Sequence, residues 1–179
     1  MPQKPFRIDV RMDEKTFRDF MLFDSFRYRK IWKRPVFFAA AFTVFAAICF
    51  AMRGTREQAD LLGTVLLIVG LGLPLVYFGM FFRTMADQIK RLKLETPRLF
   101  YTIQLSDEPE GIRMSAKGVP DQVFSWEKAE RAYRAAEVVY LYAAPGQAVV
   151  LPFQDVKAGR EALWEFLRGR LGEERLTVL

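Results

Sequence analysis

Two uncharged stretches decide the fold: Pro35–Met52 reads PVFFAAAFTVFAAICFAM, and Leu61–Phe82 reads LLGTVLLIVGLGLPLVYFGMFF. As α-helices they would be about 27 and 33 Å long, which matches the hydrocarbon core of about 30 Å in a bilayer. Neither has the polar face of a surface helix. A chain of 179 residues is too short to bury both helices on every side. The sequence therefore predicts a transmembrane helical hairpin over residues 35–82.

Basic residues are concentrated on the outer flanks of this hairpin. Residues 1–98 contain 17 Lys+Arg and 9 Asp+Glu, whereas residues 99–179 contain 10 and 12. The connection Arg53–Asp60 has only two arginines. Because cytoplasmic flanks of membrane helices are enriched in Lys and Arg, we expect both termini in the cytoplasm. The candidate contacts with the membrane surface, here called the basic belt, are Arg27, Arg29, Lys30, Trp32, Lys33, Arg34, Arg83, Lys90, Arg91 and Lys93.

Charge and composition also exclude several classes of function. The net charge of +6 and the isoelectric point near 9.6 would suggest nucleic acid, but the polar C-terminal half is slightly acidic, so we expect no nucleic-acid partner. The chain has no histidine and one cysteine, which excludes a Ser-His-Asp triad, a zinc site with a His ligand and an internal disulfide. We predict no catalytic residue, no metal and no cofactor. Ser115 and Lys117 lie two residues apart on one predicted strand and could form a nucleophile pair. No oxyanion-hole motif accompanies them.

Glycines in the second stretch define two faces of its helix. At 100° per residue, Gly63 and Gly70 share one face, and Gly72 and Gly79 share the opposite one. Small residues allow close helix packing in lipid. We expect the Gly63 face to meet an alanine stripe on the first helix, and the Gly72 face to be available to a second copy or another subunit. The alanine stripe comprises Ala40, Ala47 and Ala51.

The segment before the hairpin, residues 1–34, is predicted to contain a strand and an amphipathic helix. Phe6, Ile8, Val10 and Met12 alternate with polar residues, which is typical of a half-buried strand. Asp13 can cap a helix that runs towards Lys33. This helix could lie at the membrane interface, pack on a cytoplasmic domain, or continue into the first span.

The residues after the hairpin change to a period of two. A linker over residues 83–98, helical from about Met85 to Leu94, leads to a domain over residues 99–179. Strands are predicted over residues 99–106, 112–117, 122–126, 138–143 and 148–152. An amphipathic helix should run from the cap Asp155 to about Leu171 and stop at Gly172. This α+β order predicts a pleckstrin-homology-like (PH-like) antiparallel sheet closed by a C-terminal helix, and we hypothesise that the strand over residues 6–12 joins that sheet.

Three segments carry a family resemblance: LSDEPEGIRMS (residues 105–115), FSWEKAERA (residues 124–132) and VVYLYAAPGQAVVLPFQDV (residues 138–156). They resemble the YcxB-like family of bacterial membrane proteins. Gly111 and Ile112 match its strand-opening pair, Trp126 its tryptophan after the third strand, and Pro152 its apolar-proline end. Phe153 and Gln154 replace a pair that is usually basic, and Asp107–Pro109 lengthens a turn. The resemblance implies two membrane helices and a PH-like cytoplasmic domain at the bacterial inner membrane, and it implies no chemistry.

We therefore expect a non-catalytic, membrane-anchored protein whose cytoplasmic domain binds a partner. Its expected partners are the lipid bilayer, a protein at the cytoplasmic face and a second copy of the chain. The alternatives are an accessory subunit of a larger membrane complex and a module that binds anionic lipid.

Overall fold

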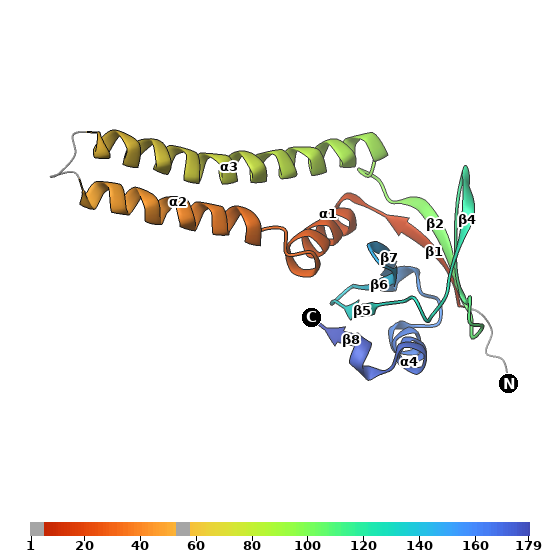
Figure 1. Cartoon of the computed structure of the whole chain (residues 1–179). Coiled ribbons are helices and arrows are strands. Elements are labelled where there is room, and N and C mark those ends of the chain that lie inside the picture. Colours follow the sequence, from red (N-terminus) through yellow and green to blue (C-terminus); the bar gives the residue numbers. More distant parts are fainter. Residues whose placement is uncertain (1–5, 53–57) are drawn as a thin grey trace. The chain divides into compact units, whose positions relative to one another are not determined.

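The computed structural model describes residues 6–52 and 58–179, and it divides the chain into two compact units (Figure 1). The helical unit is Met21–Lys93. The α+β unit combines the residues up to Phe20 with Leu94–Leu179. The helical unit is thus inserted between two segments of the α+β unit.

The helical unit contains two long apolar helices, α2 (Lys33–Ala51) and α3 (Ala59–Leu92). By length and composition, both are able to cross a membrane. Their cores agree with the stretches predicted over residues 35–52 and 61–82. The helix predicted in the linker from about Met85 to Leu94 is present as far as Leu92, and it is the C-terminal part of α3, which continues through Pro74. It ends at Lys93, whose φ of 52° takes the backbone out of the helix.

The two long helices pack through glycine and phenylalanine. A Cβ atom on Gly70 would lie 2.5 Å from Cβ of Phe42, and one on Gly63 would lie 3.0 Å from the ring of Phe50. Ala46, one turn from each phenylalanine, is 1% exposed. The predicted partner stripe is therefore wrong: phenylalanine side chains, the Cβ atom of Phe42 at Gly70 and the ring of Phe50 at Gly63, occupy the space that the glycines leave. The alanines of that stripe, Ala40, Ala47 and Ala51, are all exposed.

The helix predicted from Asp13 towards Lys33 is divided into shorter parts. Helix α1 (Glu14–Leu22) is followed by the π-helix η1 (Phe23–Tyr28) and a bend before α2. Within the α+β unit, the ring of Phe20 packs on that of Tyr140 at 5.7 Å. The start of the helix therefore packs on the α+β unit, as the second of the three alternatives proposed, and the bend separates it from α2.

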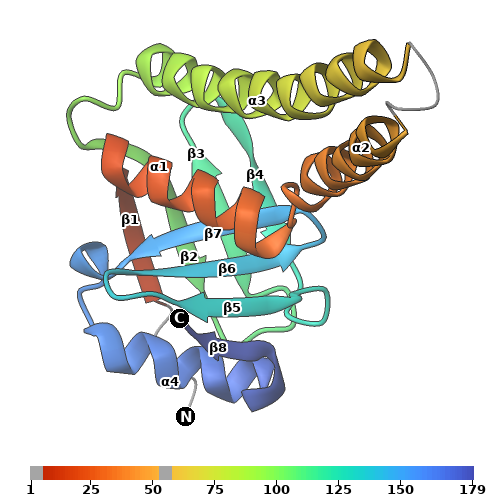
Figure 2. The ribbon, with the colours of Figure 1, turned by 90° about the vertical axis from the view of Figure 1, so that its left-hand side faces the viewer.

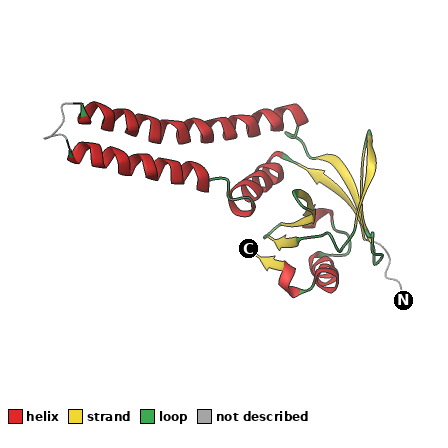
Figure 3. Ribbon diagram, viewed as in Figure 1, coloured by secondary structure: helices red, strands yellow, loops and turns green. Residues whose placement is uncertain are grey.

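The α+β unit contains two four-stranded sheets (Figures 1 and 3). The first has the order β1-β2-β3-β4 and the second the order β7-β6-β5-β8. All pairings are antiparallel except the one between β5 and β8. The strands are β1 (Phe6–Met12), β2 (Arg98–Leu105), β3 (Ile112–Ala116), β4 (Val119–Phe124), β5 (Arg131–Arg134), β6 (Val138–Ala144), β7 (Gln147–Pro152) and β8 (Leu176–Val178).

Strand β1 pairs with β2 across the whole helical insertion, which confirms the hypothesis that it joins the sheet. The register runs from Phe6 opposite Leu105 to Met12 opposite Arg98, with a bulge at Val10/Arg11. Ile8, Val10 and Met12 are no more than 3% exposed. Their spacing of two places them on the face of the sheet that forms the core.

Two hydrogen-bonded links join the first sheet to β7 and to the turn Phe153–Asp155 that follows it. The Tyr101 hydroxyl on β2 donates to the Val150 carbonyl of β7 at 2.7 Å and accepts from the Val150 N–H at 2.8 Å. Burial raises the pKa of the Tyr101 phenol, so the hydroxyl keeps its proton and serves both groups. The Arg11 N–H at the β1 bulge donates to Asp155 Oδ2 at 2.8 Å. Both links satisfy backbone groups at a strand edge.

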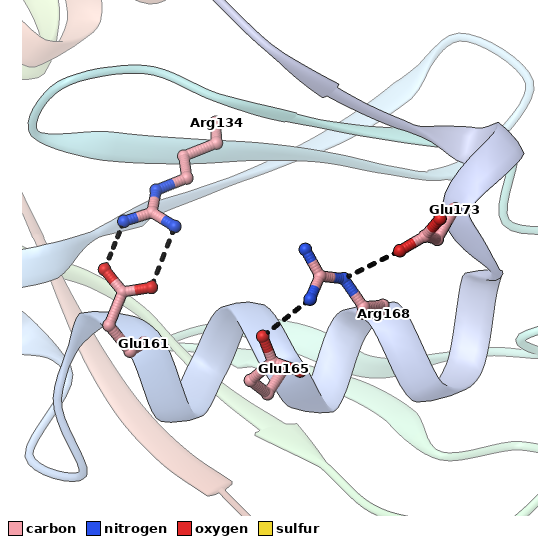
Figure 4. A network of polar contacts seen from close by, with 5 residues as sticks. All are labelled: Arg134, Glu161, Glu165, Arg168 and Glu173. Atoms are coloured by element: carbon pink, nitrogen blue, oxygen red, sulfur yellow. Dashed lines mark hydrogen bonds and ion pairs between the residues drawn. The ribbon is translucent and has the colours of Figure 1, made fainter.

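Helix α4 (Arg160–Leu171) lies against the second sheet beside β5 and β8 (Figure 2). Its predicted apolar stripe is buried, and Gly172 ends it with a φ of 74°. Arg134 of β5 donates to Glu161 at 3.0 Å (Figure 4). Its guanidinium also lies over the Trp164 ring at 5.6 Å. The buried stripe comprises Leu163, Trp164, Phe166, Leu167 and Leu171.

In this region the structure differs from the sequence-based prediction in two further ways. Asp155 does not cap α4, which begins after Gly159, because its carboxylate accepts the Arg11 N–H. Strands β5 and β8 were not predicted from the sequence. Both are short, and they pair with each other although β6, β7 and α4 separate them in the chain.

Candidate functional site

The α+β unit has a groove of about 940 Å³ beside the N-terminal part of α1. Its opposite wall is the turn between β5 and β6, and its third side is the segment that follows β7. We call it the α1 groove. It is lined by Asp13, Lys15, Thr16, Asp19, Ala135, Ala136, Glu137, Val138, Tyr140, Pro152, Phe153, Gln154 and Arg160.

The α1 wall is held by a helix cap and by a backbone hydrogen bond to the segment before β2. The Asp13 carboxylate accepts the Thr16 N–H at 2.8 Å, as the predicted cap requires. The Glu14 N–H donates to the Leu94 carbonyl at 2.9 Å, which links the start of α1 to the segment before β2. Burial alone would raise the pKa of Asp13, but the capping hydrogen bonds from Thr16 outweigh it together with further favourable interactions, so the pKa is lowered. Asp13 is therefore a carboxylate at neutral pH.

The opposite wall is fixed by backbone hydrogen bonds. The Ala135 N–H donates to the Val138 carbonyl at 2.8 Å and closes the turn between β5 and β6. The Phe153 N–H donates to the Glu137 carbonyl at 2.9 Å. These contacts attach the turn to the end of β7, so the wall does not depend on the groove being occupied.

An ion pair crosses the groove between these walls. Lys15 Nζ lies 2.7 Å from Glu137 Oε2, and both side chains are mostly exposed. The hydrogen bond between them raises the pKa of Lys15 and lowers that of Glu137. Because exposed ion pairs contribute little to stability, a ligand that offers its own charged groups could replace this pair at low cost.

The floor of the groove is aromatic. Burial, followed by the nearby charge of Asp19, raises the pKa of Tyr140 to about 12. The Arg160 guanidinium lies over the Phe153 ring at 4.7 Å, a distance suited to a cation–π contact. The groove thus combines flat apolar surfaces with both signs of charge.

The groove offers a ligand charged groups on its walls and apolar surface on its floor. Among residues 6–52 and 58–179, no group of three or more His, Cys, Asp and Glu side chains is placed to hold a metal ion. Lys117 lies beyond the end of β3, in the turn to β4. The expectation that Ser115 and Lys117 lie on one strand is therefore wrong.

The three residues singled out by the sequence resemblance lie in two places: Trp126 and Gly111 are packed together, and Pro152 lies at the end of β7. Trp126 is 6% exposed, its ring packs on Phe166 at 5.8 Å, and its Nε1 donates to the Ser106 carbonyl at 3.0 Å. Gly111 lies directly beside that indole. Pro152 ends β7 opposite Val138 and lines the α1 groove.

The groove itself was not predicted from the sequence. Phe153 and Gln154, the positions that depart from the family pattern, lie in it. Its charged residues Lys15, Glu137 and Arg160 come from three distant segments. Each looks like a solvated surface residue in its own segment, so only the tertiary structure brings them together.

The basic belt is exposed on both flanks of the helical unit. Arg27, Arg29, Lys30 and Trp32 lie in η1 and the bend, whereas Lys33 and Arg34 begin α2. Arg83, Lys90 and Arg91 lie within α3, and Lys93 follows it. The two flanks therefore differ: the first includes an irregular bend, and the second is mostly helical.

Comparisons with protein-family models, with curated proteins and with solved structures found no match.

Proposed function

We propose that this chain is a non-catalytic protein anchored in a membrane by α2 and α3, and that its α+β unit binds a protein partner at the cytoplasmic face. The single observation that carries the binding role is the α1 groove. It has rigid walls, an aromatic floor and an ion pair that a partner can replace. A segment of polypeptide with charged and apolar side chains fits this chemistry.

The proposed membrane anchoring is supported by the two apolar helices and by the basic belt. No more than 11% of the most apolar window of either helix is buried within the protein itself. In water, such a surface would be an unusually large apolar patch. The distribution of Lys and Arg favours cytoplasmic termini, and the YcxB-like resemblance favours the bacterial inner membrane.

We also propose that the α+β unit is PH-like. The support is a sheet of four antiparallel strands (β1 to β4), a second sheet that contains the antiparallel strands β5 to β7, and a helix that follows them. In this proposal the helical unit is an insertion between the first two strands, and β8 is an addition to the second sheet.

Site-specific photocrosslinking tests the binding role. A photoreactive amino acid at Ala136, which is exposed in the groove, should form a discrete adduct with a protein partner in native membranes. The matched control is the same amino acid at Asp121, exposed on β4 and outside the groove. Substituting Glu137→Lys, which replaces the ion pair by two like charges, should abolish the adduct. Equal adducts at both positions would contradict the proposal.

A second candidate function is that of a subunit in a membrane assembly, either of identical copies or with another protein. It is favoured by Gly72 and Gly79 of α3, which have nothing within 4 Å of the position of a Cβ atom. They differ in this from Gly63 and Gly70, which pack on α2. A third candidate, capture of anionic lipid by the α+β unit, has less support because residues 99–179 carry a net negative charge.

A further inference from the structure

A second cavity lies within the helical unit, at the bend before α2. It has a volume of about 680 Å³. Three cations, Arg29, Lys30 and Arg34, line one part of it. The rest is apolar and comes from both long helices: Ile31, Pro35, Phe38, Leu73, Pro74 and Tyr77.

The cations of this cavity are not neutralised in the same way. Arg29 Nε lies 2.8 Å from Asp24 Oδ2, so its charge is compensated within the bend. Lys30 and Arg34 have no carboxylate partner among the residues that the structure describes. Two positive charges therefore remain available to an anion at the wall of an apolar cavity.

The backbone at this cavity is unusual in two respects. The six-residue π-helix η1 precedes the bend, and π-helical turns often occur at functional sites. Lys30 has a φ of 52°, in the left-handed region that non-glycine residues seldom adopt. Phe26 of η1 is held on α3 by the rings of Phe78 and Phe81, at 6.0 and 5.5 Å. The conformation that places Lys30 at the cavity is therefore both costly and supported by packing, as is typical of ligand sites.

We propose that this cavity binds one anionic glycerophospholipid of the surrounding membrane. Its phosphate would lie between Lys30 and Arg34, and an acyl chain would lie along Phe38 and Leu73. This inference rests on the proposed membrane residence of α2 and α3. The charges lie at the start of the first span and the apolar wall lies within both spans, in the order of headgroup and acyl chain in a lipid. A soluble anion would leave the apolar wall uncovered.

Lipid retention by the purified full-length protein tests the site. The protein is reconstituted in bilayers of four parts phosphatidylcholine and one part phosphatidylglycerol, extracted in mild detergent and examined by native mass spectrometry. Wild type should retain one phosphatidylglycerol. The double variant Lys30→Gln/Arg34→Gln should reduce retention about tenfold or more, the scale expected when two charged contacts near a membrane are lost.

The matched control is Lys90→Gln/Arg91→Gln, which removes the same charge from the exposed belt outside the cavity. It should retain the lipid as wild type does. A cavity-filling variant, Leu73→Trp, keeps all charges and should also lose the lipid. Equal loss in both charge variants, retention in all variants, or equal retention of phosphatidylcholine would each overturn the proposal.

Failure of this inference and failure of membrane residence are distinguishable. Carbonate extraction of cell membranes reports whether each variant is membrane-integrated, and circular dichroism reports its helix content. Variants that are integrated and helical but retain lipid like wild type refute the lipid site alone. Wild-type protein released by carbonate refutes both the lipid site and the proposed anchoring.

Discussion

Gly111 lies against the indole of Trp126: a Cβ atom on Gly111 would be 2.6 Å from Nε1 of that ring. The same atom would be 2.2 Å from the Ser106 carbonyl oxygen, which accepts the indole N–H. Glycine is therefore required here because three groups approach closely: this carbonyl, the indole and the Glu108 carbonyl at 2.6 Å. The contact fixes the turn between β2 and β3 to the ring that packs on Phe166 of α4.

Substituting Gly111→Ala should destabilise the α+β unit by about 1–3 kcal/mol, the usual cost of overpacking a site that cannot expand. Thermal unfolding in detergent, followed by tryptophan fluorescence, measures the change. The matched control is Gly169→Ala in α4, where nothing lies within 4 Å of the new atom. It should stabilise the protein by up to about 1 kcal/mol through helix propensity. Wild-type stability of Gly111→Ala would contradict the close packing.

Substituting Tyr101→Phe should cost about 1–3 kcal/mol, because it leaves two buried backbone groups of Val150 without their partner. The ring stays in place, so packing changes little. Hydrogen exchange gives a local measurement: the Val150 amide should exchange faster than in wild type, while the amides within the β6–β7 ladder keep their protection. Unchanged exchange at Val150 would show that the hydroxyl does not protect this strand edge.

Replacing Asp155 tests the link between β1 and the turn after β7 through its pH dependence. Burial raises the pKa of Asp155 above its usual 3.8, against the opposing hydrogen bond from Arg11. A carboxyl group whose pKa is higher in the folded protein than in the unfolded protein stabilises the fold when the pH is below its unfolded-state pKa. This stabilisation is lost as the pH rises through its folded-state pKa. Asp155→Asn removes the charge and keeps an acceptor oxygen. It should unfold at a higher temperature than wild type at pH 7, and the difference should shrink towards pH 3.

The control for this experiment is Asp155→Ala, which removes the acceptor of the Arg11 N–H. It should unfold at a lower temperature than wild type throughout this pH range. The opposite result would be that Asp155→Asn unfolds at a lower temperature than wild type at pH 7 and at the same temperature at low pH. It would show that folding stabilises the charged carboxylate.

The two glycine faces of α3 should respond differently to leucine. Gly70→Leu places its side chain against Phe42 of α2 and should separate the long helices, lowering the thermal stability of the helical unit. Gly72→Leu/Gly79→Leu has free space around it and should leave that stability unchanged. If this face binds a second copy, the double variant should be monomeric by light scattering where wild type is not. Unchanged assembly in the double variant would exclude the face as an interface.

Local patterns predicted many of the elements because neighbouring residues contain the relevant information. The period of two in Phe6–Met12 and the apolar stripe of α4 each describe one face of one element. Strand β5 was missed because only Ala132 is fully buried in its four residues, and its stability comes from β6 and β8 on either side. The cap at Asp155 was misassigned because a carboxylate suited to a helix end was used instead by a bulge in β1.

In the candidate site, too, local features could be predicted from the sequence, whereas contacts between distant segments could not. Asp13 was predicted as a helix cap, and it is one. Nothing in its neighbourhood shows that Glu137 would face Lys15 across a groove. The basic belt could be predicted from the positions of Lys and Arg in the sequence. The bend that brings Lys30 and Arg34 to one cavity could not.

The sequence by itself determined the two long apolar helices, the division of charge between the halves of the chain and the alternation of strands with turns. These depend on composition and on periods within a few residues, which short-range sterics and hydrophobicity control. Only the tertiary structure decided that β1 pairs with β2 across residues 13–97, that Phe42 and Phe50 cover Gly70 and Gly63, and that the α1 groove and the cavity at the bend form. Those outcomes depend on which surfaces fit best when segments distant in the chain meet, and no single segment contains that information.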